Sequence, residues 1–525
     1  MDCNCIRHSE FPHTSKLFAD LVYNPDRVRT FYPHIPGDPG VFEAIAREIK
    51  FSSHQRAALV SALLQQNGPS PSLDLLAREG TVAVVTGQQV GLFSGPAYTI
   101  YKALTAVKLT RELSERGIPA VPVFWLATED HDFAEVNQAW LFDSEHHPVK
   151  LLEDRAPASN QPVGQLILSA PPTAQLREVL SAFPFGGEVA SLVEEAYQPG
   201  HSLGQAFSTL LKKLLAQYDL LHVDPMAPAI RELAAPAIRA TLEQAPQLST
   251  ALLDRKRELE EAGYHAQVHI EDQTSLVFLL ENGRRYTLRR YGTDYLQNGR
   301  RFTTAELRER AAHLSPNALL RPVVQDSILP TIAYIGGPAE LAYLAQSEVI
   351  YRAILGRMPA ALHRASFTLL DSRSRKLMNR YGLTLADCAH GEDHVRERIA
   401  AKLIPSTLVN SVAHTKSTVE QSVDCLVNEL AGFDASLAAA LGKSRKKILY
   451  QISKMEGKIG REAMARDARI TQDAAYLSNL LYPHRHLQER LYSILPFLAR
   501  HGMGLIDDLY GCVRLECPDH QLATV

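Results

Sequence analysis

The sequence has little of several features that would define a broad class of protein. It carries six cysteines, two tryptophans, and 55 Lys+Arg against 58 Asp+Glu. No block of like charge indicates binding to nucleic acid or to an anionic membrane. No basic-then-apolar leader opens the chain, and no apolar run reaches the roughly eighteen residues of a membrane-spanning helix. We therefore expect a soluble, cytoplasmic protein of roughly two to four domains, without a nucleic-acid or membrane partner.

The cysteines are too few for a disulfide framework. They lie towards the two ends of the chain, which favours reduced thiols. Neither Cys3-Asn4-Cys5 nor the pair Cys512 and Cys517 has the spacing of a zinc site. His265 and His269 would be far apart on a strand, so no metal site is predicted.

The stretch 81–116 predicts a strand, a polar loop and a helix, the opening unit of a doubly wound α/β domain. Val82–Val85 is the expected strand, and Thr86–Pro96 is the loop. Pro96 suits the first turn of the helix. The loop amides and the positive helix end would then face an anion, with Lys102 on the next turn. The loop has neither the dinucleotide glycine pattern nor a P-loop pattern, so a plain turn is the alternative.

A second apolar run, Ala120–Leu126, ends in the polar stretch Thr128–Asp132. Carboxyl ends of parallel strands open onto one crevice, so this stretch should lie near the first loop. Clustered carboxylates raise one another's pKa unless a cation, a metal or a ligand amine offsets them. The pattern favours recognition of an amine, a hydroxylated sugar or Mg–ATP, or acid–base catalysis by His131. The alternative is a helix start capped by Asp130 or Asp132.

A third stretch, 321–340, repeats the first pattern. It is interpreted as an apolar strand, then Gly336-Gly337-Pro338, then a helix with Glu340 in its first turn. The paired glycines would let the backbone approach a ligand closely, although a plain turn also fits. Ala365–Asp371 is predicted as one more strand of the same sheet.

Beyond residue 390 the pattern becomes that of long helices. Apolar residues from Val419 to Leu437 recur at alternating steps of four and three, and the stripe continues to Ile459 with a phase slip near Leu437–Leu441. This is a coiled-coil seam, which needs a returning helix or a second subunit to cover it.

Together these patterns predict an α/β fold: a Rossmann-like doubly wound core with two connecting insertions, plus a long α-helical coiled-coil domain. Asn282-Gly283 between two strand-like runs marks a hairpin in the second insertion. The expected domains are a helical lead-in with the first half of the core (1–142), a first insertion (143–218), more core (219–262), a second insertion (263–316), the second half of the core (317–390), the coiled coil (391–475) and a closing segment (476–525).

Four long strings resemble the bacillithiol-biosynthesis cysteine-adding enzymes, a bacterial family of cysteine ligases. They are Val84–Lys102, Pro122–Val136, Gln325–Gln346 and Arg364–Asp371, and the resemblance extends over nearly the whole chain. One difference is Ser94, where glycine is expected. A serine should be tolerated there unless the position needs a positive φ.

The resemblance implies a core similar to class I synthetase-like nucleotidyl transferases and a homodimer formed through the coiled coil. It also implies the last step in making a low-molecular-weight thiol, in which the cysteine carboxyl is joined to the amine of glucosaminyl malate. Because amide formation in water requires carboxyl activation, ATP is the expected cofactor, through an adenylate or an acyl phosphate. Mg²⁺ would arrive with the nucleotide, and ADP could be retained.

On this resemblance the site residues fall into groups. Glu129, Asp130, His131 and Asp132 are the catalytic candidates, with His131 or a carboxylate deprotonating the attacking amine. Arg375, Lys376 and Arg490 are candidates for a second nucleotide site. Two walls of the crevice supply the substrate-binding candidates, and the first of them would hold a phosphate or a malate carboxylate. The candidates are Thr86, Gly87, Gln88, Gln89, Gly91, Gly95, Pro96, Tyr98, Lys102, Thr128, Gln325, Asp326, Tyr334, Gly336, Gly337 and Glu340.

Two other functions remain compatible with the residues. The chain could be another sugar- or nucleotide-transferring enzyme of the same fold, because a fold does not determine its chemistry. It could also be a non-catalytic, nucleotide-binding dimeric scaffold that works through its coiled coil.

Overall fold

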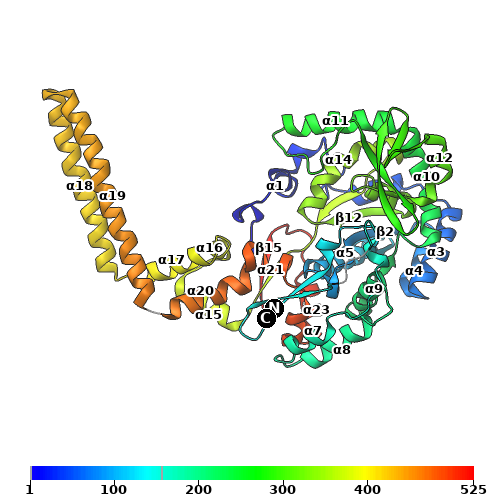
Figure 1. Ribbon diagram of the computed structural model, residues 1–525, viewed down its shortest axis with the longest axis horizontal. Coiled ribbons are helices and arrows are strands. Elements are labelled where there is room, and N and C mark those ends of the chain that lie inside the picture. Colours follow the sequence, from blue (N-terminus) through cyan, green and yellow to red (C-terminus); the bar gives the residue numbers. More distant parts are fainter. Residues whose placement is uncertain (1–2, 155–157, 467) are drawn as a thin grey trace. The chain divides into compact units, whose positions relative to one another are not determined.

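The computed structural model describes residues 3–154, 158–466 and 468–525 (Figure 1). These residues form two compact units. Unit 1 contains the described residues up to Ser144 together with Pro148–Thr368 and Glu489–Ala523. Unit 2 contains Glu145–His147, Leu369–Gln488 and the last two residues.

A five-stranded parallel sheet forms the centre of unit 1. In spatial order the strands are β6, β3, β2, β12 and β13, so the order along the chain is 3-2-1-4-5, as in a Rossmann fold. The direction of winding reverses between β2 and β12, and ligands of such sheets bind at this switch point. The strands are β2 (Val82–Gln89), β3 (Ala120–Ala127), β6 (Leu221–Val223), β12 (Thr331–Gly336) and β13 (Ala360–His363).

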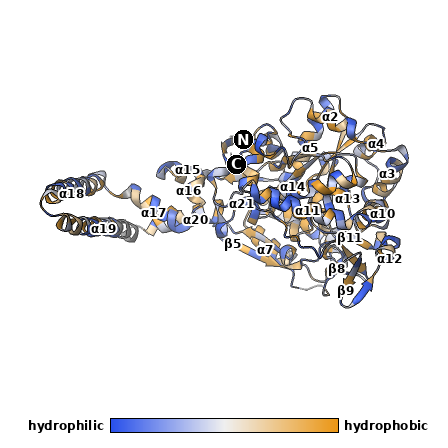
Figure 2. Ribbon diagram, turned by 90° about the horizontal axis from the view of Figure 1, so that it is seen from above, coloured by the Kyte–Doolittle hydropathy of each residue, from blue (hydrophilic) through white to orange (hydrophobic). Residues whose placement is uncertain are grey.

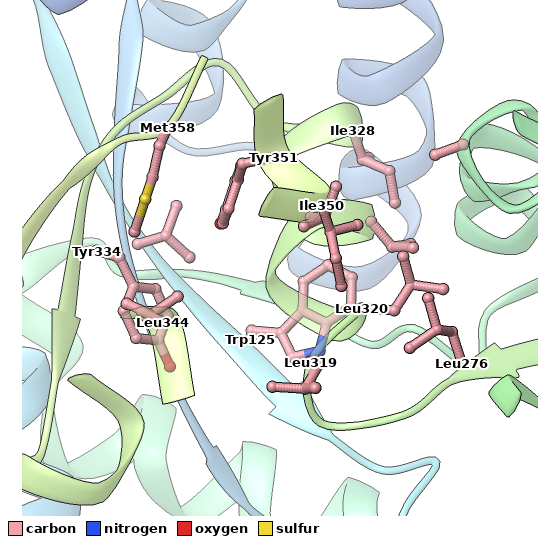
Figure 3. Packing of buried hydrophobic residues seen from close by; sticks show 14 of the residues in the cluster. Trp125, Leu276, Leu319, Leu320, Ile328, Tyr334, Leu344, Ile350, Tyr351 and Met358 are labelled. Carbon is pink, nitrogen blue, oxygen red and sulfur yellow. The ribbon is translucent and has the colours of Figure 1, made fainter. Parts of the chain in front are cut away.

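Both faces of this sheet are covered by helices, because its strands are apolar on both sides. On β2, Ala83 and Val85 join one buried cluster, and Val82 and Val84 join another. The first cluster includes Trp125 and Tyr334, which Figure 3 shows among its packed side chains. Its helices are α1 (Lys16–Tyr23), α3 (Ser53–Asn67), α4 (Pro71–Leu76), α10 (Pro228–Glu243), α11 (Ala245–Glu261), α13 (Arg321–Ile328) and α14 (Pro338–Ile354), whereas α2 (Val41–Glu48) and α5 (Tyr98–Glu115) cover the other face.

The opening unit has the predicted strand, loop and helix, but their limits differ from the prediction. Strand β2 continues to Gln89 rather than ending at Val85, because it pairs with β3 as far as Ala127. A 3₁₀ turn at Leu92–Ser94 then delays the helix, so Pro96 precedes α5 instead of lying in its first turn. Ser94 has a φ of 70°, so the position that resembles a family glycine does require a positive φ.

The first half of the third stretch differs from the predicted strand. Arg321–Ile328 is helix α13, and only Thr331–Gly336 is strand. Pro338 begins α14, and Glu340 lies in its first turn, as predicted.

The strand predicted at 365–371 is not in the central sheet. Phe367–Leu370 (β14) belongs to a separate sheet, and β13 is the last strand of the core. The last amide bonded to β12 is that of Arg364, which donates to the Gly336 carbonyl at 3.0 Å, and the Ala365 amide donates to the Thr105 hydroxyl at 2.9 Å.

The segments between the core strands carry small sheets and helices. The predicted hairpin is confirmed: β7 and β8 are antiparallel around Asn282 and Gly283, which both have positive φ. These segments contain α6 (Phe133–Val136), β4 (Gln138–Phe142), β5 (Pro148–Leu152), α7 (Thr173–Leu180), α8 (Gly186–Ala196) and α9 (Leu203–Leu214), and then β7 (Thr274–Glu281), β8 (Arg284–Tyr291), β9 (Asp294–Gln297), β10 (Arg300–Phe302), α12 (Thr304–Glu309) and β11 (Leu314–Pro316).

Unit 2 contains a hairpin of two long helices, α18 (Ser406–Phe433) and α19 (Ala435–Arg466), which lie side by side (Figures 1 and 2). The predicted stripe is therefore not one continuous seam, because the chain reverses at Asp434. Salt bridges between Lys416 and Glu456 and between Arg445 and Asp424 connect the two helices. Among the described residues, no helix is long and apolar enough to cross a membrane. The other helices of unit 2 are α15 (Ser372–Tyr381), α16 (Leu385–Cys388), α17 (Glu392–Leu403) and α20 (Ala468–Leu481).

Candidate functional site

A cleft of about 680 Å³ opens in unit 1 at the carboxyl ends of β2, β3 and β12. It lies at the switch point of the sheet, where the fold places ligands. All three chemically rich stretches of the sequence contribute to its walls, together with residues of β8, α13 and α21 (Gln488–Leu491). The volume is within the range of small-molecule sites, which is roughly 300–1,000 Å³.

One wall contains an ion pair between the buried Lys102 ammonium and the partly exposed Glu340 carboxylate. The Lys102 ammonium also donates to the Gly87 carbonyl at 2.9 Å and to the Gln88 side chain at 2.8 Å. Burial lowers the pKa of Lys102, and the charge of Glu340 opposes this shift. Because its charge is already balanced, Lys102 is not the free anion-binding cation that the sequence pattern indicated.

Glu340 organises the start of α14. It accepts hydrogen bonds from the Gly337 amide at 2.8 Å and from the Tyr334 hydroxyl at 2.7 Å. Burial alone would raise the pKa of this carboxyl, but Lys102 and the two hydrogen bonds hold the pKa below its ordinary value. The Gly337 loop is thus fixed by Glu340.

Asp130 and His131, at the end of β3, lie against Arg285 of β8. Asp130 accepts hydrogen bonds from the Gln89 side chain at 2.8 Å and from the His131 amide at 2.7 Å. Burial would raise the pKa of Asp130, but these hydrogen bonds and the charge of Arg285 lower it. The carboxylate is therefore ionised and engaged within the protein.

The Arg285 guanidinium lies 3.2 Å from Nδ1 of His131. Burial lowers the pKa of His131, and the neighbouring guanidinium lowers it further, so the imidazole is neutral at pH 7. Because guanidinium groups only donate, Nδ1 accepts here and the ring proton is on Nε2. In this arrangement His131 has no free basic nitrogen.

Glu129 differs from its neighbours, since its side chain is buried and one carboxyl oxygen, Oε1, has no hydrogen-bond partner among the described residues. Burial raises the pKa of Glu129, against the charges of Arg285, Arg231 and Arg321. A buried cleft carboxyl with a raised pKa and a free oxygen suits proton transfer or binding of an amine.

Two arginines of the cleft have unbalanced charge. Arg321 donates to the Tyr343 hydroxyl at 2.7 Å and to the Gln325 side chain at 3.0 Å. Within the described residues, neither Arg321 nor Arg490 forms a salt bridge. Both are therefore available to an anionic ligand.

Arg364 also lines the cleft, but it is paired with Glu489. Its two terminal nitrogens lie 2.6 Å and 3.0 Å from the two carboxyl oxygens, and both side chains are buried. Ser366 and the Phe367 amide donate to the same carboxylate at 2.8 Å and 2.9 Å. This pair supports the wall of the cleft from behind.

Two amides of the loop after β2, the stretch predicted to hold an anion, are bonded within the loop itself. The Gly91 amide donates to the Gln89 carbonyl, and the Gly95 amide donates to the Leu92 carbonyl. A Cβ on Gly91 would lie 3.1 Å from the Gly95 Cα, so glycine at these two positions allows the two backbone segments to pack closely. Both amides are therefore occupied.

Other predicted residues have structural partners outside the cleft. The Thr86 hydroxyl donates to the Ile335 carbonyl at 2.8 Å, and the Thr128 hydroxyl donates to Asp224. Asp326 accepts from Tyr351, because α13 turns this side chain into the core. The predicted residues that line the cleft are Gly87, Gln88, Gln89, Tyr98, Lys102, Glu129, Asp130, His131, Tyr334, Gly337, Glu340 and Arg490; those that do not are Thr86, Gly91, Gly95, Pro96, Thr128, Asp132, Gln325, Asp326 and Gly336.

The three cations predicted to bind a second nucleotide are not grouped within either unit. Arg490 lines the cleft of unit 1, whereas Arg375 and Lys376 are exposed on α15 of unit 2. The described residues contain no group of three or more His, Cys, Asp or Glu side chains placed to hold a metal.

The cleft arginines Arg285, Arg321 and Arg364 were not predicted from the sequence. Arg285 lies on a strand of alternating pattern, where a charged residue is ordinarily exposed. Arg321 precedes an apolar run that was interpreted as a strand. Only the Asn-Gly turn, which fixes the hairpin register, could have shown that Arg285 points inward.

The strand order and the polar cleft at the switch point define a Rossmann-like α/β protein joined to a helical hairpin. Residues 1–365 match the family described as bacillithiol biosynthesis BshC, N-terminal Rossmann-like domain, and residues 367–525 match its C-terminal coiled-coil domain. The chain belongs to this BshC family of bacillithiol biosynthesis.

Curated relatives extend the match over the full chain. A protein of Solibacter usitatus is 59% identical over 100% of both chains, and one of Koribacter versatilis is 35% identical over 99% of both. A protein of Salinibacter ruber is 31% identical over 97% of this chain and 96% of its own. Each is named "Putative cysteine ligase BshC", and the family is therefore one of ligases.

Proposed function

We propose that this protein is a cytoplasmic ligase that joins the carboxyl group of L-cysteine to the amine of glucosaminyl malate, as the last step of bacillithiol synthesis. The observation that carries the proposal is Glu129, a buried carboxyl with a free oxygen in a cleft that also holds two unpaired arginines. An amine and carboxylates are the groups that such a cleft would recognise.

The charges of the cleft suit the two substrates. The malate carboxylates of glucosaminyl malate would bind Arg321 and Arg490, because guanidinium groups bind carboxylates through paired hydrogen bonds. Only a neutral amine attacks an acyl group, so the reaction needs a base. Glu129 is a better candidate for this base than His131, because Nδ1 of His131 already accepts a hydrogen bond from Arg285.

Activation of the cysteine carboxyl requires a further substrate, for which ATP is the natural candidate. ATP supplies an adenylate or an acyl phosphate when it is bound, and Mg²⁺ would accompany it. Because Arg321 and Arg490 are assigned to the malate carboxylates, the phosphates of ATP need other donors, and the Gly91 and Gly95 amides after β2 are already occupied. Arg375 and Lys376 remain candidates for a second nucleotide site in unit 2 that could retain ADP.

The experiment that tests the function is amide formation by the purified protein from cysteine, glucosaminyl malate and ATP. Another sugar- or nucleotide-transferring activity of the same fold would leave these substrates unjoined. A non-catalytic nucleotide-binding scaffold would bind them and release them unchanged.

We also propose a homodimer formed through the α18–α19 hairpin. One side of each helix is half-buried against the other, yet a second apolar stripe stays exposed. Leu426 and Phe433 lie one heptad apart on α18, and Ile448 and Met455 lie one heptad apart on α19, with exposed fractions of 42% to 84%. Such a stripe is typical of a helix bundle that needs further helices to close.

The double variant Leu426→Glu/Ile448→Glu is therefore expected to be a monomer in light scattering coupled to size exclusion, where the unmodified protein is a dimer. The reason is that two carboxylates would have to be buried in the interface. The control is Gln421→Glu/Ser453→Glu at exposed positions of the same helices, which should remain dimeric. A dimeric Leu426→Glu/Ile448→Glu protein would place the subunit contact elsewhere.

A further inference from the structure

The two ends of unit 1 pair with each other. Strand β1 (Cys3–Ile6) runs antiparallel to β15 (His520–Thr524), with Cys5 opposite Gln521 and Ile6 opposite His520. The pairing brings side by side residues that are 514 to 520 positions apart, and no pattern in the sequence indicates it.

Cys517 lies in the turn that precedes β15, and this turn brings its thiol towards Cys5. The Cys517 thiol donates to the Cys5 sulfur at 3.4 Å. A disulfide requires about 2.05 Å between the sulfurs, so a small closing movement would suffice. Cys5 is exposed and Cys517 is partly exposed, so small reagents can reach the pair.

From this geometry we propose that Cys5 and Cys517 form a reversible disulfide, a redox modification site at which a low-molecular-weight disulfide is the oxidant. Of the other described cysteines, Cys388 is buried and Cys425 is exposed on α18. The proposal is independent of the ligase activity.

The oxidation proceeds in two exchange steps. The Cys517 thiolate attacks a disulfide RSSR, forms a Cys517–SR bond and releases one RS⁻. The Cys5 thiolate then attacks the Cys517 sulfur, forms the Cys5–Cys517 bond and releases the second RS⁻. Overall, two protein thiols are oxidised, one RSSR is reduced to two RSH, and the two protons end on the released thiols.

Burial and the contact with Cys517 raise the pKa of Cys5 to about 11, against the charge of Arg514. Because the thiolate is the attacking species, exchange at the pair should be slow at neutral pH.

The disulfide would fasten strands that support the cleft. Three residues after Cys5 lies His8, whose ring packs against His363 at 4.8 Å between centroids. Three residues after Cys517 lies His520, whose ring nitrogen lies 2.6 Å from the Ser366 hydroxyl. That hydroxyl also donates to Glu489, which forms the ion pair with the cleft residue Arg364. Each cysteine is therefore three residues from a histidine that packs near this ion pair.

The full-length protein, reduced and then freed of reductant, is incubated with oxidised glutathione. Digestion without reduction should yield one cross-linked species that joins the peptide of Cys5 to that of Cys517, and dithiothreitol should remove it. Hydrogen exchange of the amides of residues 4–8 should slow several-fold in the oxidised protein, because β1 is then held to β15.

Cys5→Ser and Cys517→Ser should each abolish the cross-link and the slower exchange, whereas Cys425→Ser on exposed α18 should keep both. Stable mixed disulfides with glutathione at both positions, without a cross-link, would overturn the proposal. A cross-link that leaves the exchange of residues 4–8 unchanged would equally contradict it, because the disulfide would then not fasten the strands.

Discussion

Glu129→Gln is expected to lower the rate of amide formation by about 10²- to 10⁴-fold, the range that a general base contributes. Glutamine keeps the shape and a hydrogen-bonding oxygen but cannot take a proton. The measurement is the rate of product formation at saturating substrates. Asp132→Asn is the matched control, since Asp132 is exposed, outside the cleft and only three residues away; it should change the rate little.

The pH dependence follows from the raised pKa of Glu129. The base is active only when it is ionised, so the rate of the unmodified enzyme should rise with pH through this raised pKa. The variant should lack that rise. Equal rates for Glu129→Gln and Asp132→Asn at all pH values would remove Glu129 from the chemistry.

The same residue links function to stability. The folded protein binds the Glu129 proton more tightly than the unfolded chain does, because burial raises the folded-state pKa. The free energy of unfolding should therefore fall as pH rises from the unfolded pKa through the folded one. Glu129→Gln should then unfold at a higher temperature than the unmodified protein at pH 7, and the difference should shrink in acid.

Arg364→Met is expected to destabilise unit 1 by about 3–5 kcal/mol, because it leaves the buried Glu489 carboxylate without its cation. Burial alone would raise the pKa of Glu489, but Arg364 and its other donors hold the pKa at about 2. The stability from this pair is present above the unfolded pKa and is lost as pH falls towards 2. Chemical denaturation at pH 7 and at pH 3 measures both effects.

Two further variants keep this second prediction testable. Arg364→Met/Glu489→Gln should be less destabilised than the sum of its single variants, because no charge is left buried. Arg116→Met removes the exposed partner of Glu43 and should cost less than about 1 kcal/mol. Additive effects at Arg364 and Glu489 would show that the two side chains do not support each other.

The core of unit 1 was predictable because it depends on local apolar runs. Val82–Val85 and Ala120–Leu126 are short apolar runs, each followed by a polar loop, which is typical of buried parallel strands. The carboxyl-end rule then places Gln88, Asp130 and Gly337 around one cleft. The same reasoning failed at Arg321–Ile328, where Val323, Val324 and Ile328 form the buried side of a helix. A short apolar run does not distinguish these two states.

The partners of the site residues were not predictable, because they come from distant parts of the chain. In the sequence alone, Lys102 and Glu340 each fit a role in ligand binding, but in the folded protein they form an ion pair with each other. Asp130 lies beside Arg285, which is 155 residues away in the sequence, and Arg364 pairs with Glu489, which is 125 residues away. Which charges are neutralised within the protein decides which remain for a ligand, and only the tertiary structure provides that information.

If the cleft of unit 1 joins cysteine to glucosaminyl malate, as we propose, the purified protein must form the amide. The most direct measurement incubates the purified protein with isotope-labelled cysteine, glucosaminyl malate and Mg–ATP, and follows the amide product together with AMP or ADP by mass spectrometry. We expect label in the amide, in step with consumption of the nucleotide, and almost none with Glu129→Gln. Product formed equally by the unmodified protein and by Glu129→Gln, or nucleotide consumed without any amide, would contradict the claim.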